Sequence, residues 1–379
     1  MVETIDAMVL EHYPFAKQKG IDLRVFSNQL RNLPLDELED DQFLVELARA
    51  VALLRDGHTR IERYHLEQLA EPALSLREAD DGLVYVSHLK AKGLGLLVGD
   101  RIDTIDGVAA AQYLEARRAL PSAWHQGQIG HIGVDHMGGA ASALAGPAGT
   151  SVVLGLAQGH EITLDRRNFF SEPVARRLPG NVGYIDIATF GFIDDLDRLD
   201  TAINDLMDSR ALIIDLRGNG GGYPSVTDGL FGRLIAEDVA AFDMVAADGT
   251  HKRTIGPTPR GKTYDGEVVI LTDGMTFSAS NYLAQRLVYH KRGVLVGERT
   301  GGGSASPEQG LLLVPGIWFQ VSTYVLQTPE GVNAEDGLEP QVAVSFSSDE
   351  IVNGLATKSA VVGKDKVLDE AIRFLKEKR

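Results

Sequence analysis

The stretch from Ala211 to Gly222, ALIIDLRGNGGG, joins a strand-like apolar run to a glycine-rich turn that could take part in chemistry. A buried strand that ends in such a turn exposes backbone N–H groups, because glycine places no side chain in the way. Phosphate cradles and oxyanion holes both use this arrangement. A phosphate site would need a Gly-Lys-Ser/Thr ending or a GxGxxG turn entering a helix. Here Tyr223-Pro224 follows instead. The turn therefore favours an oxyanion hole.

An oxyanion hole implies a nucleophile, and the candidates are Ser278 and Ser280. Both follow the apolar run from Val268 to Leu271 and precede a segment with helical spacing, at a predicted strand-to-helix junction. A serine there can have its hydroxyl exposed above a helix N-terminus, which stabilises a developing anion. A helix-capping serine has the same setting, so this segment alone leaves both roles open.

A serine nucleophile needs a base, and His58 has the most suggestive setting among the ten histidines. It follows Asp56-Gly57, a signal that ends a helix, where the backbone can fix a side chain. On its local sequence alone, His58 could equally be a surface or core residue. The other histidine-rich stretch contains His125, His131, Asp135 and His136, whose spacing matches no compact set of metal ligands. We therefore predict neither a metal nor a cofactor.

The chain divides into three regions with different residue patterns, and these regions must position the candidate residues. Residues 1–66 are predicted to be largely helical, with a helical apolar stripe made of Phe43, Leu44, Leu47, Val51 and Leu54. Residues 67–168 carry short alternating segments and turn signals such as Asp106-Gly107, which indicate a small β-rich domain. Residues 178–379 alternate strand and helix patterns, which predicts an α/β core with a largely parallel sheet.

Composition limits the classes of partner. The chain has 379 residues, no cysteine and a net charge of −16, which argues against nucleic acid and against an anionic membrane surface. Disulfides and thiol catalysis are excluded. No run reaches the length of a membrane span, and the N-terminus lacks the pattern of a signal peptide. As given, the chain is expected to be cytoplasmic; an exported protein that had been trimmed would be periplasmic or extracellular.

Taken together, six segments resemble the C-terminal processing peptidase family, which includes the tricorn core and the interphotoreceptor retinoid-binding protein modules. The likeness covers nearly the whole chain, in family order. The segments are Leu54–Thr59, Gly93–Gly107 with Gly146–Thr150, Val182–Phe190, Leu212–Gly222, Phe277–Ser280 and Val296–Thr300. The resemblance implies a crotonase-like α/β core with an N-terminal helical region and a PDZ-like domain.

The resemblance also implies roles for particular residues. Ser278 would be the nucleophile, and the backbone N–H groups of Gly221 and Ala279 would form the oxyanion hole. Bacterial processing peptidases use a lysine base in the stretch that corresponds to residues 301–303, which are all glycine here. The tricorn-like branch uses a histidine, and His58 fits that branch. Its acidic partner would be Glu335.

The second choice for the acid is Asp336, the next residue. The chain departs from the family at Gly57, where tricorn has a serine that links the histidine to the glutamate; Thr59 is a candidate substitute. Asn281 and Gln341 replace acidic residues of many members, and neither change affects the proposed chemistry.

The sequence thus predicts a serine endopeptidase or carboxy-terminal processing peptidase that acts on a peptide or unfolded protein substrate through an acyl-enzyme. One alternative is an inactive module of the same fold that binds a hydrophobic ligand or a peptide. Another is an acyl-thioester enzyme of crotonase-like architecture, against which the Ser-His pair and the PDZ-like insertion argue. The oligomeric state stays open.

Overall fold

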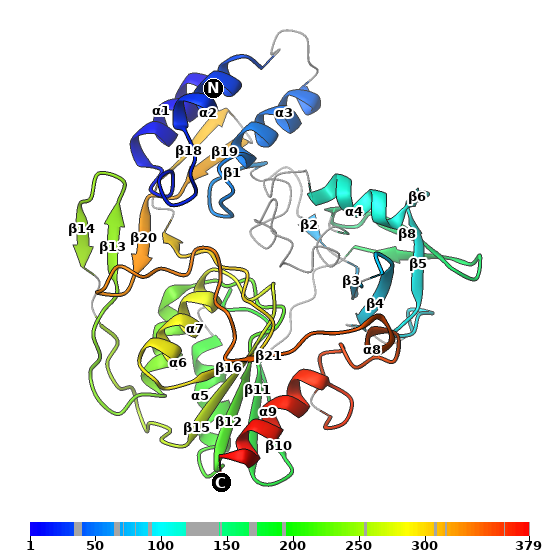
Figure 1. Ribbon diagram of the computed structural model, residues 1–379, viewed down its shortest axis with the longest axis vertical. Coiled ribbons are helices and arrows are strands. Elements are labelled where there is room, and N and C mark those ends of the chain that lie inside the picture. The colour runs from blue at the N-terminus through cyan, green and yellow to red at the C-terminus, as the bar shows by residue number, and fades with distance from the viewer. Residues whose placement is uncertain are drawn as a thin grey trace.

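The computed structural model is a mixed α/β fold with several sheets (Figure 1). It describes residues 1–33, 40–63, 69–70, 72–79, 81–89, 93–118, 144, 146–166, 173–191, 195–253, 256–306, 309–314, 317–359 and 361–378. The candidate metal residues His125, His131, Asp135 and His136 lie outside these ranges. No helix in the described ranges is long and apolar enough to cross a membrane.

The central sheet has six strands in the order β10-β11-β12-β15-β16-β21. Their bounds are β10 Val174–Leu178, β11 Val182–Asp186, β12 Ala211–Asp215, β15 Glu267–Thr272, β16 Val294–Gly297 and β21 Val342–Ala343. β10 runs antiparallel to β11, and the other pairings are parallel. Every residue of β12 is buried, as expected for a parallel strand covered on both faces. The predicted α/β core is confirmed at this level.

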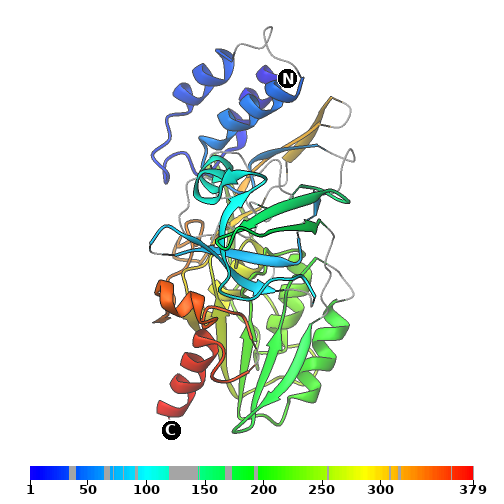
Figure 2. The same ribbon diagram turned by 90° about the vertical axis from the view of Figure 1, so that its right-hand side faces the viewer.

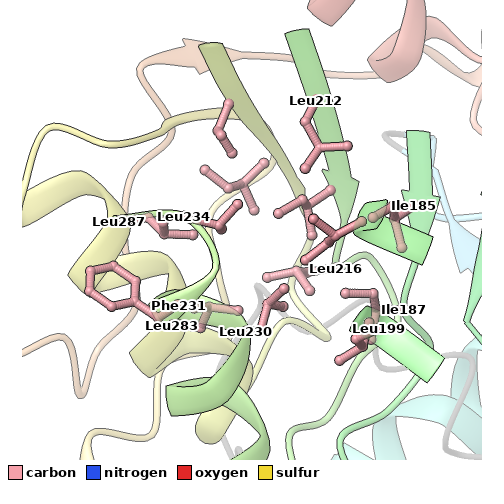
Figure 3. Packing of buried hydrophobic residues seen from close by; sticks show 14 of the residues in the cluster. Ile185, Ile187, Leu199, Leu212, Leu216, Leu230, Phe231, Leu234, Leu283 and Leu287 are labelled. Carbon is pink, nitrogen blue, oxygen red and sulfur yellow. The ribbon is translucent and has the colours of Figure 1, made fainter. Parts of the chain in front are cut away.

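Helices cover both faces of this sheet. The larger core cluster lies between the sheet and three helices, α5 Asp195–Asp205, α6 Pro224–Gly232 and α7 Ala279–Tyr289 (Figure 3). Alternate residues of the same strands point to the opposite face, where they pack against α9 Lys366–Glu377. The glycine-rich turn and the start of α7 both follow the carboxyl ends of parallel strands, so they meet at one edge of the sheet.

The N-terminal helices pack against strands from late in the chain. α1 Val2–His12, α2 Leu23–Arg31 and α3 Asp40–Ala52 share a buried cluster with β1 Arg60–Arg63 and β19 Ile317–Val321. β19 lies between β1 and β18 Gln309–Val314 in a three-stranded antiparallel sheet. Figure 2 shows this hairpin beside the N-terminal helices, at the end of the molecule opposite α9. Residues some 250 positions apart thus form one core.

A second β-rich unit has its own core. Its main sheet contains β3 Leu74–Glu78, β4 Val84–Leu89, β5 Arg101–Ile105, β6 Val108–Ala109, β8 Ser151–Leu156 and β9 Glu161–Asp165. α4 Ala110–Arg118 closes the hydrophobic cluster of this unit, and α8 Ser348–Val352 packs on β4 from outside. The remaining strands are the pair β2 Leu69–Ala70 and β7 Gly146–Pro147, and a sheet of β13 Asp243–Ala246, β14 His251–Arg253, β17 Ala305–Ser306 and β20 Tyr324–Gln327.

Candidate active site

Ser278 lies in the turn between β15 and α7, immediately before the first residue of the helix. Its backbone has φ 58° and ψ −122°, a conformation that side-chain-bearing residues rarely adopt and that recurs at functional sites. A serine in a tight strand-turn-helix junction of this kind presents its hydroxyl outward, as in the nucleophile elbow of α/β-hydrolases. The Ser278 N–H donates to the carbonyl of Gly302 at 3.0 Å, which fixes the turn from below. Its hydroxyl makes no capping bond to α7, so the capping role is not observed.

His58 meets this hydroxyl across 220 residues of sequence: its Nε2 lies 2.8 Å from the Ser278 Oγ. The imidazole stacks on the ring of Phe277 with centroids 4.8 Å apart. Its backbone N–H donates to the Asp56 carboxylate at 2.9 Å, an Asx turn that begins where α3 has ended. The Gln320 amide donates to the His58 carbonyl at 2.9 Å, which ties the turn to β19. The predicted base and nucleophile are therefore brought together.

Burial shapes the acid-base behaviour of this histidine. Burial lowers the pKa of His58 to about 4; the Asp56 carboxylate opposes that effect, and the charges of Arg60 and Lys19 add to it. The imidazole is therefore neutral near pH 7, as a general base must be. Its Nδ1 is buried and has no hydrogen-bond partner among the described residues.

The glycine-rich turn after β12 packs directly against the nucleophile. A Cβ on Gly221 would lie 2.8 Å from the Ser278 Cβ and 2.9 Å from the Ala279 nitrogen, so only glycine allows this approach. The N–H of Gly221 donates to the Asn219 side-chain oxygen at 2.9 Å, and the Ser280 hydroxyl donates to the same oxygen at 2.6 Å. Both predicted oxyanion donors thus belong to segments in contact with Ser278, and that of Gly221 is engaged by Asn219.

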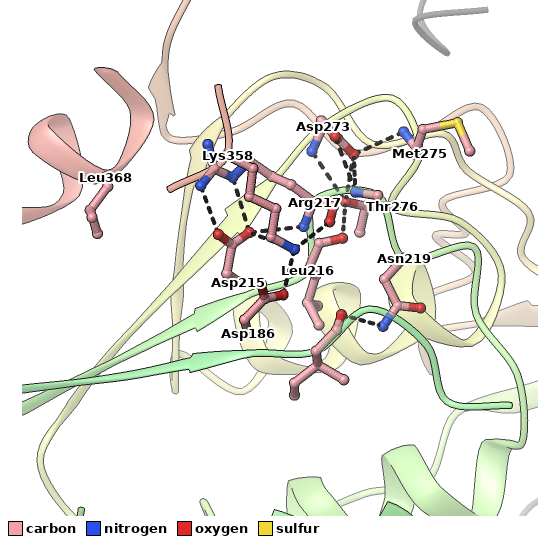
Figure 4. A network of polar contacts seen from close by, with 12 residues as sticks. Asp186, Asp215, Leu216, Arg217, Asn219, Asp273, Met275, Thr276, Lys358 and Leu368 are labelled. Carbon is pink, nitrogen blue, oxygen red and sulfur yellow. Dashed lines mark hydrogen bonds and ion pairs between the residues drawn. The ribbon is translucent and has the colours of Figure 1, made fainter. Parts of the chain in front are cut away.

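A buried charge network supports the start of that turn (Figure 4). The Arg217 guanidinium binds Asp215 at 2.7 Å and Asp365, beside α9, at 2.6 Å. Asp273, after β15, accepts from the Gly218 N–H at 3.0 Å. Lys358 lies 2.6 Å from the Asp186 carboxylate at the end of β11. These contacts hold the carboxyl ends of three neighbouring strands together beneath the site.

Glu335, the predicted acidic partner, is buried and faces a different residue. Its Oε1 lies 2.8 Å from the Lys19 Nζ, and its Oε2 accepts from the Ser304 N–H at 2.9 Å. No hydrogen bond joins Glu335 to His58 among the residues that the structure describes. Burial raises the pKa of Glu335 to about 8, although Lys19 opposes the rise. Asp336 accepts from the Gln18 amide at 3.1 Å.

Thr59, the candidate link between base and acid, donates to Asp56 at 2.6 Å and accepts from the Ser322 N–H. It stabilises the histidine turn and does not reach Glu335. Sequence reasoning missed three residues here, Lys19, Asp56 and Asn219. Asp56 and Asn219 could have been recognised, because each lies two residues before its partner and can close an Asx turn. Lys19 gave no signal.

A cavity of about 530 Å³ opens in front of the pair. It is lined by His58, Ser278 and the glycine turn, and also by Tyr282, Gln320 and Leu326. The cavity is large enough for several side chains of a bound chain. No group of three or more acidic or imidazole side chains in the described ranges could hold a metal ion.

Comparisons with known proteins indicate a family and a fold. Residues 181–344 match the family model of peptidase family S41. The carboxy-terminal processing protease CtpB of Bacillus subtilis is 29% identical over 169 residues, covering 43% of this chain and 34% of that protein. The carboxy-terminal-processing protease of Bartonella bacilliformis is 26% identical over 283 residues, covering 68% of this chain and 57% of that protein. This chain therefore spans about a third to three fifths of these relatives.

The fold is also similar to a solved structure, that of mature CPAF complexed with lactacystin. The TM-score is 0.71 at 14% identity, and the alignment covers 99% of this chain and 97% of that chain. At this identity the likeness concerns the fold. It extends to the N-terminal helices and the second β-rich unit, since nearly the whole chain is aligned.

Proposed function

This chain is a member of the C-terminal processing peptidase family, peptidase family S41, and from that premise we propose that it is a serine peptidase. The observation that carries the proposal is the 2.8 Å contact between the His58 Nε2 and the Ser278 Oγ. A neutral imidazole within hydrogen-bond distance of a serine at a strand-to-helix turn is the pairing that activates a hydroxyl for attack on a carbonyl.

In the proposed reaction, Ser278 attacks the carbonyl carbon of a peptide bond while His58 takes its proton. The tetrahedral oxyanion is stabilised by the N–H groups of Gly221 and Ala279, at about 3 kcal/mol per donor in comparable sites. The oxyanion competes with the Asn219 oxygen for the Gly221 N–H. His58 then protonates the leaving amine, and water hydrolyses the acyl-enzyme to release the acid and regenerate Ser278.

Histidine rather than lysine is proposed as the base, because residues 301–303 offer no lysine and His58 already contacts the nucleophile. For the acidic member we retain Glu335 first and Asp336 second. Direct contact of Glu335 with His58 would require its side chain to leave Lys19. In the described geometry, the Asp56 carboxylate supplies the negative charge that favours the imidazolium.

We also propose finer assignments for the fold. The core would be crotonase-like, and the second β-rich unit would be a PDZ-like domain that binds a peptide end or controls access to the site. The substrate would be a peptide or an unfolded protein. An inactive binding module remains the alternative function, and the intact Ser-His contact argues against it.

The test is turnover of a fluorogenic peptide mixture, with labelling by a serine-reactive phosphonate. We expect wild type to be active and labelled, and Ser278→Ala and His58→Ala each to lose at least about 10³-fold in kcat/KM. His251→Ala, which alters an exposed histidine, is the matched control and should match wild type. If only Ser278→Ala loses activity, another residue is the base. If folded wild type is neither active nor labelled, the peptidase proposal is wrong.

A further inference from the structure

Lys19 lies in the segment between α1 and α2, far in sequence from every residue of the proposed site. Its side chain is only 5% exposed, and its Nζ lies 4.9 Å from the centre of the Phe15 ring. A buried ammonium must find hydrogen-bond acceptors, since it carries three donors and loses its hydration. The two that it finds are the Arg55 carbonyl, near His58 in the chain, and the Glu335 carboxylate, whose segment contacts the support of Ser278.

The first contact of Lys19 is with the segment that leads to His58, the proposed base. The Lys19 Nζ donates to the carbonyl of Arg55 at 2.5 Å, and the Arg55 guanidinium donates in return to the Lys19 carbonyl. Arg55 has φ 49° and begins the turn that carries His58 three residues later. Reciprocal bonds to this residue fix the point from which the histidine turn leaves α3.

The second contact of Lys19 is with Glu335, whose segment adjoins the support of Ser278, the proposed nucleophile. The Lys19 Nζ lies 2.8 Å from the Glu335 Oε1. The backbone carbonyl of Glu335 accepts from the Gly303 N–H at 3.0 Å, and the adjacent Gly302 carbonyl accepts from the Ser278 N–H at 3.0 Å. A Cβ on Gly302 would lie 2.0 Å from the Glu335 oxygen, so these two segments are in close contact. Displacement of Glu335 would therefore displace the support of the serine elbow.

We propose that Lys19 is a positioning residue that holds His58 and Ser278 at reacting distance, by clamping the Arg55 turn to the Glu335 segment. The inference rests on the proposed function, and it extends the working site to the segment between α1 and α2. It also gives the buried carboxylate of Glu335 a role that needs no contact with His58. A misplacement of about 1 Å between reacting groups can cost about 10²-fold in rate, so such a clamp has a measurable effect.

The neighbouring contact between Gln18 and the same loop supports this assignment. The Gln18 amide donates to Asn333 at 3.2 Å and to Asp336 at 3.1 Å, and it accepts from the Asn333 side chain at 3.0 Å. Two consecutive residues of the N-terminal segment thus bind one loop beside the site. Gln18 is exposed, so its bonds contribute less than the buried contact between Lys19 and Glu335.

The central experiment compares Lys19→Met with Lys17→Met, which alters an exposed lysine of the same segment. With the fluorogenic peptide, we expect Lys19→Met to lower kcat by about 10²-fold, with KM within about threefold of wild type. Phosphonate labelling should slow in parallel, because it needs the same activated serine. Lys17→Met should have the kcat of wild type. Lys19→Arg keeps the positive charge, and its kcat should be at least about tenfold higher than that of Lys19→Met.

The acid limb of the pH profile gives a second readout, which reports whether the charge of Lys19 acts on His58. The charged groups that act on His58 are Asp56, Arg60 and Lys19, and the charge of Lys19 lowers the pKa of the imidazole. Its removal should therefore shift the acid limb of kcat/KM toward higher pH in Lys19→Met. The kcat of the double variant Lys19→Met/Glu335→Leu should be no lower than that of Lys19→Met alone, because both substitutions remove the same contact between Lys19 and Glu335.

The outcomes distinguish failure of the clamp from failure of the proposed function. If wild type is active and folded Lys19→Met keeps kcat within threefold, the clamp is wrong and the peptidase proposal stands. If wild type itself is inert and unlabelled, the peptidase proposal fails first. If Lys19→Met does not fold, Glu335→Leu carries the test, since it removes the oxygen that accepts from Lys19 with little change in volume. Folded Glu335→Leu with wild-type kcat would then overturn the clamp.

Discussion

At the residue scale, the site depends on side chains whose local backbone is unusual. Ser278 has φ 58°, and a conformation of this kind costs about 1–3 kcal/mol unless surrounding contacts impose it. Those contacts are the Gly302 carbonyl below the turn and the close approach of Gly221 beside it. His58 is likewise held by the Asx turn of Asp56 and by the ring of Phe277. Pre-arranged groups need little reorganisation when the reaction begins.

The low pKa of His58 predicts an unusual pH profile. The base must be neutral, and burial lowers its pKa from 6.5 to about 4, so neutral imidazole persists as the pH falls. We expect kcat/KM to stay constant from pH 7 down to about 5 and to fall by half near pH 4. The measurement is kcat/KM of the fluorogenic peptide across pH 3.5–8 at constant ionic strength.

Stability must be followed in the same buffers. A lowered folded-state pKa contributes stability that is present above about pH 6.5 and is lost as the pH falls toward 4. A thermal melt at each pH therefore separates inactivation from unfolding. Half-maximal activity near pH 6.5 in a fully folded protein would show that His58 titrates as an exposed histidine does.

The sequence predicted the parts of the site that are local in the chain. The serine at a strand-to-helix junction, the glycine turn and the histidine after a helix end each follow from short-range patterns. It did not reveal the partner of Glu335, because Lys19 is 316 positions away and ordinary lysines are exposed. Nor did it reveal that Asn219 engages the Gly221 N–H, which depends on side-chain geometry within the turn.

At the element scale, the decisive feature is the turn of residues 218–222 that follows β12. It starts from the Asp215-Arg217-Asp365 ion network and ends at Pro224, the first residue of α6. Between these fixed points, the turn presses its backbone against the start of α7. Three glycines of this turn have positive φ, and two of them, Gly218 and Gly221, have very different surroundings, which allows strain and contact to be tested separately.

We expect Gly221→Ala to reduce kcat at least about 10²-fold, because its Cβ would lie 2.8 Å from both the Phe277 oxygen and the Ser278 Cβ. Gly218→Ala is the matched control: its φ is +75° and no atom lies within 4 Å of the added Cβ. Both variants bear a backbone cost of about 1–2 kcal/mol. Steady-state kinetics and thermal melts on both variants make the comparison. Equal losses of kcat would mean that strain, rather than contact with the nucleophile, sets the effect.

At the scale of the whole molecule, the two catalytic candidates come from different cores. Ser278 lies in the turn after β15 of the central sheet, whereas His58 follows helices that pack on β19. The sequence predicted the N-terminal helical region, but not that its core is completed by residues 309–321. Antiparallel pairing at this separation leaves no short-range pattern. The boundaries at residues 66, 168 and 178 stay predictions.

Phe319 tests this connection, because it is fully buried among the N-terminal helices. Phe319→Ala should cost about 3–5 kcal/mol in the free energy of unfolding of that region. We expect faster amide hydrogen exchange in α1 and α2 as well as in β19, with loss of peptide turnover. Leu311→Ala, on the neighbouring β18, alters a side chain that is 43% exposed and should change little. Faster exchange confined to β19 would contradict a shared core.

The pairing of β1 with β19 also affects when, during synthesis, the segment that carries His58 can reach its final position. Residues 60–63 find their partner only when residues 317–320 are available, so the base cannot be fixed during synthesis of the first 300 residues. A nascent chain would carry α1–α3 without the strands that complete their core. Such long-range closure is slow and leaves apolar surface uncovered meanwhile. The N-terminal helices of a ribosome-bound chain therefore keep this apolar surface exposed until residues 317–320 have emerged.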